Sequence, residues 1–93
     1  MDNFRVLNRE TEVLLEEHKR TEESLEYIDY LLLVYEDKVD NFVTQWKRMN
    51  PDFANRHFLT LNRRIEELLE DRKKLILLLG EINSHLRENE EKI

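Results

Sequence analysis

Apolar side chains recur at alternating intervals of three and four residues along the first half of the chain. Eleven of the fourteen positions in this series are apolar, and the exceptions are Thr11, His18 and Thr21. This heptad spacing places all members on one face of an α-helix, so we predict a helix over residues 3–49. The series is Phe4, Leu7, Thr11, Leu14, His18, Thr21, Leu25, Ile28, Leu32, Tyr35, Val39, Phe42, Trp46 and Met49.

The second half repeats the pattern and predicts a helix over residues 51–90. Ten of its twelve heptad positions are apolar, with Arg72 and Asn89 as the exceptions. We call the two series together the seam. Its second part is Ala54, Phe58, Leu61, Ile65, Leu68, Arg72, Leu75, Leu79, Ile82, Leu86, Asn89 and Ile93.

The only strong helix-breaking signal between the two series is Asn50-Pro51. Asn is a favoured N-cap residue, Pro suits the first helical position, and the residue before Pro is pushed out of the α region. A connection this short joins antiparallel neighbours, so the predicted fold is all-α. We expect one domain over residues 1–93, a coiled-coil-like two-helix hairpin with its turn near residues 49–53. A turn centred on residue 51 or 52 places residue i opposite about 103 − i, and so His18 near His85.

Aromatic residues gather on both sides of the turn. Trp46, Pro51 and Phe58 form the predicted turn motif, and Phe42 and Phe53 lie close to it in the sequence. Aromatic side chains bury a large area, so a packed cap that locks the turn is the favoured interpretation. A recognition surface is the alternative.

Large aliphatic residues outside the seam are the clearest departure from a plain hairpin. A two-helix hairpin buries one stripe per helix, and a helix that is apolar all round is normally buried all round. We therefore predict an interface with another helical chain or with a second copy. The alternative is that one or two of these residues flank the seam and the rest are exposed without consequence. The predicted interface residues are Leu31, Leu33, Val34, Ile76, Leu77 and Leu78.

Charge and composition exclude several classes of protein. The net charge is −6, with 12 acidic and 5 basic residues in 1–40, 5 and 8 in 41–74, and 4 and 2 in 75–93. This excess of acidic residues argues against nucleic-acid binding, because proteins that bind nucleic acid usually carry a dense basic stripe. The longest apolar runs are too short to insert across a membrane, and the start of the chain lacks the apolar core of a signal peptide. We expect a cytoplasmic protein, or one exported together with its partner.

No residue pattern predicts catalysis, a cofactor or a metal ion. Two helices offer no concave pocket for a nucleophile and its base, and the Glu-x-x-His motif of di-iron bundles is absent. A pair formed by His18 and His85 across the hairpin is a minor alternative, either as a metal site or as a pH-responsive pair. We predict a protein that is not an enzyme.

The hairpin pattern resembles the WXG-type small helical proteins of Gram-positive type VII secretion systems. Arg48 stands where that family has Gly, and no aromatic residue is followed four positions later by an acid, as in the export signal of that pathway. The chain more closely resembles the small helical accessory proteins encoded with LXG toxins. That resemblance rests on the Glu-rich first helix, Trp46, His57-Phe58, Arg72-Lys73 and the Leu75/Leu79 run.

This resemblance implies a targeting chaperone. Such a protein would bind the helical N-terminal domain of an LXG toxin, with or without a second small accessory protein, and help its export. The alternative from another class is a homodimeric four-helix bundle that acts as a scaffold or regulator and has no role in secretion.

Overall fold

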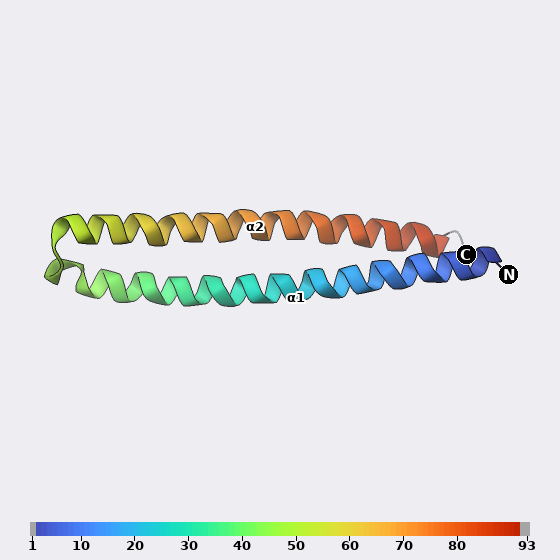
Figure 1. Ribbon diagram of the computed structural model, residues 1–93, viewed down its shortest axis with the longest axis horizontal. Coiled ribbons are helices and arrows are strands. Elements are labelled where there is room, and N and C mark those ends of the chain that lie inside the picture. Colours follow the sequence, from blue (N-terminus) through green and yellow to red (C-terminus); the bar gives the residue numbers. More distant parts are fainter. Residues whose placement is uncertain (1, 92–93) are drawn as a thin grey trace. The chain divides into compact units, whose positions relative to one another are not determined.

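The chain folds into two long helices, as the heptad spacing predicts. The computed structural model describes residues 2–91, and within this range the side chains of residues 9–90. Helix α1 (Asp2–Gln45) is followed by a 3₁₀ turn (Trp46–Arg48) and helix α2 (Pro51–Glu91). The two helices pack against each other in antiparallel directions (Figure 1). The predicted all-α helical hairpin is therefore confirmed.

The turn differs from the prediction at the end of the first helix. The α-helix ends at Gln45, four residues early, and the backbone tightens into the 3₁₀ turn, in which the Met49 N–H donates to the Trp46 carbonyl at 3.2 Å. The second helix begins as predicted at Pro51. Its cap is Asn50, whose side-chain oxygen accepts the Asp52 N–H at 2.9 Å and whose carbonyl accepts the Ala54 N–H at 2.8 Å. The first bond satisfies a donor that a helix start would otherwise leave unpaired, and the second is the first regular hydrogen bond of α2.

Contacts divide the chain into two compact units, and each contains parts of both helices. We call Tyr27–Arg72 the turn unit, and Met1–Glu26 with Lys73–Ile93 the terminal unit. Buried side chains in the turn unit are Ala54, Leu61 and Leu68. Those in the terminal unit are Thr21, Ile82 and Asn89.

Burial follows the predicted seam almost residue by residue. Among the described side chains, every seam position is buried or half-buried except Trp46 and Phe58, which are exposed. Outside the seam, only Leu31, Val34 and Arg64 of the described side chains are half-buried, and the others are exposed. Thr21 tolerates burial because its hydroxyl donates to the Glu17 carbonyl at 2.8 Å, so the polar group keeps a partner.

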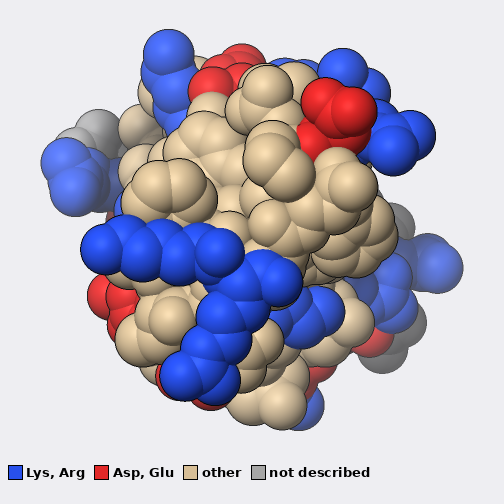
Figure 2. Space-filling model, turned by 90° about the vertical axis from the view of Figure 1, so that its left-hand side faces the viewer, with Lys and Arg blue, Asp and Glu red and all other residues tan. Residues whose placement is uncertain are grey.

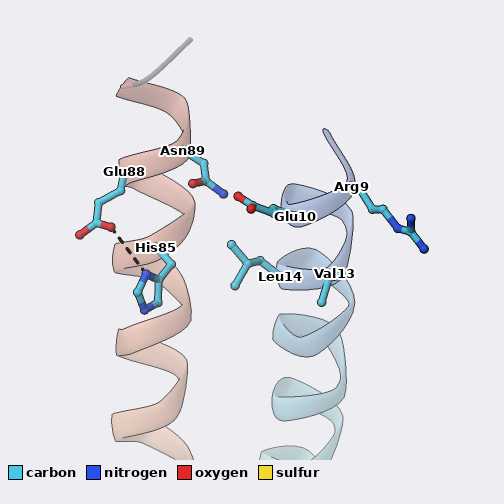
Figure 3. Close-up of a pocket in the computed structure, with 7 residues that line it drawn as sticks. All are labelled: Arg9, Glu10, Val13, Leu14, His85, Glu88 and Asn89. Atoms are coloured by element: carbon cyan, nitrogen blue, oxygen red, sulfur yellow. Dashed lines mark ion pairs between the residues drawn. The ribbon is translucent and has the colours of Figure 1, made fainter. Parts of the chain in front are cut away.

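The predicted pairing of the helices is wrong by about three residues. In the turn unit, Phe42 meets Phe58 with ring centroids 5.9 Å apart, and Arg72 Nε donates to Asp29 Oδ1 at 2.8 Å. Residue i thus lies opposite about 100 − i, because the chain reverses at Met49 and Asn50 and not at residue 51 or 52. In the terminal unit, His85 lines the same cavity as Leu14, so the expected pairing of His18 with His85 is corrected (Figure 3).

Candidate functional site

The middle of α1 exposes a set of apolar side chains in the turn unit. Tyr27, Tyr30 and Leu33 are 62%, 61% and 65% exposed. The predicted interface residues Leu31 and Val34 are half-buried. We call these five side chains the α1 apolar surface.

The spacing of these residues gives the surface its shape. At about 100° per residue, Tyr30, Val34, Tyr27 and Leu31 fall within one strip about 100° wide along α1. The strip lies beside the seam, which is why Leu31, nearest to it, is half-buried. Leu33 extends the apolar surface further round the helix. Seven of the eight residues in 27–34 are apolar, so this stretch is apolar on nearly every side.

The one charged side chain within this stretch, Asp29, pairs with a side chain of α2. The Asp29 carboxylate forms an ion pair with Arg72 at 2.8 Å, and both side chains are about half-exposed. A pair at this exposure contributes little to stability, ~0–1 kcal/mol. At 100° per residue Asp29 lies about 150° round the helix from the centre of the strip formed by Tyr27, Tyr30, Leu31 and Val34, so the strip itself contains no charged residue.

Arg64 of α2 marks a polar border beside Tyr35. Its guanidinium donates to the Glu67 carboxylate at 3.2 Å. The hydrogen bond with Glu67 is the main reason that the pKa of the Arg64 guanidinium lies above its usual value, and the interaction with Tyr35 raises it further. The Lys38 ammonium lies 4.8 Å from the centre of the Tyr35 ring. Tyr35 therefore has charged side chains of both helices beside it.

The three predicted interface residues of α2 belong to the terminal unit. Ile76, Leu77 and Leu78 are all exposed, and Leu77 is the most exposed of them at 62%. Because they are consecutive, they point in directions about 100° apart and do not share one face of α2. We call them the α2 triplet and treat them as a surface separate from that of α1.

Two residues of the α1 apolar surface are absent from the sequence-based interface. The sequence-based interface consists only of large aliphatic side chains outside the seam, and it therefore lacks Tyr27 and Tyr30. The signal that finds them is their spacing with Leu31 and Val34, which repeats the three- and four-residue intervals of a helix face. Tyrosine is also enriched in protein interfaces.

The aromatic turn motif is partly packed and partly exposed. Phe42 contacts Phe58 and His57 of α2, with ring centroids 5.9 and 5.7 Å apart. His57 in turn stacks on Phe53 at 5.9 Å. These contacts support the interpretation as a packed cap, yet Trp46, Phe53 and Phe58 all remain exposed. Beside them lies a groove of about 430 Å³ lined by Phe42, Trp46, Lys47, Met49, Pro51, Ala54, Asn55 and Phe58.

A larger cavity, of about 770 Å³, lies in the terminal unit. Glu10 and Leu14 point from α1 toward α2, whereas Arg9 points away (Figure 3). His85 lies on the α2 side with Asn89, and its Nδ1 is 3.6 Å from a Glu88 carboxylate oxygen. Among the described residues, no group of three or more His, Asp or Glu side chains is placed to hold a metal ion.

None of the helices, within the part of the chain that the structure describes, is long and apolar enough to cross a membrane. Comparison of the chain with models of protein families, with curated proteins and with solved structures finds no match. The site must therefore be interpreted from its own chemistry.

Proposed function

We propose that this protein is a non-enzymatic helical adaptor that binds a helical partner alongside α1. The observation that carries this proposal is the exposure of Tyr27, Tyr30 and Leu33 on a stretch of α1 that is apolar on nearly every side. A two-helix hairpin has no third helix to cover such a stretch. A partner helix laid along the α1 apolar surface would cover it, with anchors at the spacing of a helix face.

Covering this surface would contribute favourable free energy to binding. Full burial of one large apolar side chain is worth about 1.5–3 kcal/mol, and a few central anchors carry most of the energy of an interface. Tyr27 and Tyr30 suit this role because their rings add apolar area while their hydroxyls remain able to reach water at the rim. Leu77 of the α2 triplet offers a further anchor in the terminal unit.

For the identity of the partner, we propose the helical N-terminal domain of an LXG toxin, with the adaptor acting as a targeting chaperone for type VII export. The support is the resemblance carried by Trp46, His57-Phe58, Arg72-Lys73 and the Leu75/Leu79 run. The α1 apolar surface agrees with this role, since a chaperone of a helical domain needs an unsatisfied helical face. A second small accessory protein would complete the complex where one is encoded nearby.

The test is a double substitution on the α1 apolar surface, Tyr30→Glu with Leu33→Glu. Two carboxylates placed against an apolar partner should abolish co-purification with the LXG N-terminal domain, because burying an unpaired charge is strongly unfavourable. The helical circular dichroism of the isolated variant should be unchanged, since both positions are exposed. The matched control is Asn41→Glu with Thr44→Glu, which adds the same charge at the same spacing on exposed positions of α1.

Two results would contradict the proposal in different ways. Unchanged co-purification of the Tyr30/Leu33 variant would refute the interface. Failure of the wild-type protein to bind any LXG domain encoded near its gene would refute the partner, and the adaptor would then need another helical chain. A separate Leu77→Glu variant shows whether the α2 triplet takes part.

A further inference from the structure

The turn carries a second surface that differs in chemistry from the α1 apolar surface. Residues 41–64 contain five basic side chains and one acidic side chain, in a chain whose net charge is −6. Seen from the turn, Lys and Arg side chains lie across this end of the turn unit with uncharged surface between them (Figure 2). Lys47, Arg48 and Arg56 are all exposed, and Asp52 is the only carboxylate in this segment.

The groove beside these charges has an apolar lining. The rings of Phe42, Trp46 and Phe58 contribute to it together with Met49, while Lys47 and Asn55 are its polar members. Ala54, which is buried, is the smallest side chain among the lining residues. The groove therefore combines an apolar interior with a cation at its edge.

The origin of the groove lies in the 3₁₀ turn. Trp46 occupies a seam position in the sequence, and a continuous α-helix would direct it toward the second helix. A 3₁₀ turn has 3.0 residues per turn instead of 3.6, so the heptad phase is lost at this residue. Trp46 is accordingly 50% exposed, and the small Ala54 leaves space that a larger seam residue would fill.

We propose that this groove binds an acidic peptide segment through one large apolar side chain, with Lys47 and Arg48 attracting its carboxylates. The volume of about 430 Å³ accommodates such a side chain with part of its backbone. Charge complementarity selects the acidic sequence around it. This surface is independent of the proposed adaptor function, because it uses none of the residues of the α1 apolar surface.

Other anionic partners fit the groove less well. Nucleic acid is held mainly through many phosphate contacts, whereas Lys47 is the only cation that lines this groove. A membrane surface would be recognised by projecting apolar side chains and a basic periphery, and would leave a concave apolar groove unfilled. An acidic peptide with an apolar anchor uses both the groove and the surrounding charge.

Trp46 provides the measurement, because it is the only tryptophan in the chain and lines the groove. The full-length protein is titrated with blocked acidic peptides, each with a single central leucine, methionine, phenylalanine or isoleucine. At least one peptide should shift the Trp46 emission to shorter wavelength with a Kd below about 1 mM. Peptides with a central alanine, or with lysine in place of the acids, should bind about tenfold more weakly or not at all.

Variants assign the effect to the turn. Lys47→Glu with Arg48→Glu should weaken peptide binding about tenfold. Added salt should likewise weaken peptide binding by the wild-type protein. The control Lys73→Glu with Lys74→Glu makes the same change in charge at two exposed neighbouring positions of the terminal unit, and its affinity should equal that of the wild-type protein. Circular dichroism confirms that both variants remain helical.

Three outcomes would overturn the proposal. One is the absence of a fluorescence shift with every acidic peptide, and another is equal affinity for the Lys47/Arg48 variant. The third is a shift produced only by phosphatidylglycerol vesicles, or only by raising the protein concentration. Vesicles would identify a membrane surface as the occupant, and concentration dependence would identify a second copy. Neither result depends on whether an LXG domain binds α1.

Discussion

Two neighbouring leucines of α2 show how strongly the environment changes from one residue to the next. Leu68 is 2% exposed and occupies a seam position, whereas Leu69 is 51% exposed. Both are aliphatic, both lie in the same helix turn, and both have the same intrinsic helix propensity. If each is replaced by alanine, any difference between the two variants in the free energy of unfolding therefore reports packing alone.

Leu68→Ala is expected to lower the free energy of unfolding by about 2–5 kcal/mol, because it removes buried methyl groups and leaves a cavity. Leu69→Ala should change it by no more than about 0.5 kcal/mol, as is usual for exposed positions. Urea unfolding followed by circular dichroism measures both. Equal effects of the two substitutions would mean that Leu68 is not in the core.

Which side chains are buried was largely predictable at the scale of single residues. The three- and four-residue spacing identified the buried positions because a helix presents one face to its neighbour, whatever the details of the turn. It failed at Trp46 and Phe58, which flank the turn. At Trp46 the backbone changes to a 3₁₀ turn, and heptad spacing carries no information about a local change of helix type. Phe58 lies in regular α-helix and contacts Phe42, yet it remains 42% exposed.

The relative position of the two helices could not be predicted from the same spacing. A slip of three or four residues still brings one apolar seam against the other, so the hydrophobic pattern admits several registers. The length and form of the turn decide among them. The observed ion pair between Asp29 and Arg72 is a direct indicator of the register.

A double-mutant cycle on Asp29→Asn and Arg72→Gln should give a coupling energy of about 0.2–1 kcal/mol that falls as salt is added. Under the register predicted from the sequence, Asp29 would instead face Lys74. The corresponding cycle on Asp29→Asn and Lys74→Gln should therefore give no coupling outside experimental error. Thermal unfolding of the single and double variants supplies the four values for each cycle, and the reverse result would contradict the observed register.

Gly80 poses a separate question about α2. Glycine in a helix interior is unfavourable relative to alanine, and a Cβ atom added at Gly80 would meet no described atom within 4 Å apart from the adjacent part of its own helix. Gly80→Ala should therefore stabilise the isolated protein by about 0.5–1 kcal/mol, measured by urea unfolding. A loss of stability would show that the helix needs glycine here.

The same substitution also distinguishes two roles for Gly80. If a partner helix approaches α2 closely at this position, Gly80→Ala will weaken the complex while it stabilises the free protein. If Gly80 is merely tolerated, the affinity for the partner will be unchanged.

At the scale of the whole molecule, the distribution of charge opposes self-association through α1. Residues 1–40 carry 12 acidic and 5 basic side chains, so two copies that met along their first helices would bring like charges together. Like-charge contacts disfavour wrong partners more than they affect the stability of a single chain. The α1 apolar surface thus favours a partner of different charge over a second copy.

Light scattering on a sizing column should accordingly give a mass close to 11.5 kDa that does not depend on protein concentration at low salt. Added salt should increase any self-association, because it screens the repulsion. A stable dimer at every concentration would contradict this expectation. It would favour the homodimeric scaffold, in which a second copy covers the exposed apolar side chains.

The antiparallel pairing also determines the order in which the chain can assemble. The distance along the sequence between facing residues is small beside the turn, as between Phe42 and Phe58, and reaches 43 residues between Asp29 and Arg72. Each further pair closes a longer loop at a higher entropic cost, although each step away from the turn adds little. The turn unit is therefore the natural place for folding to begin, and the terminal unit joins last and opens first. Slow-exchanging amide protons should be concentrated near the turn.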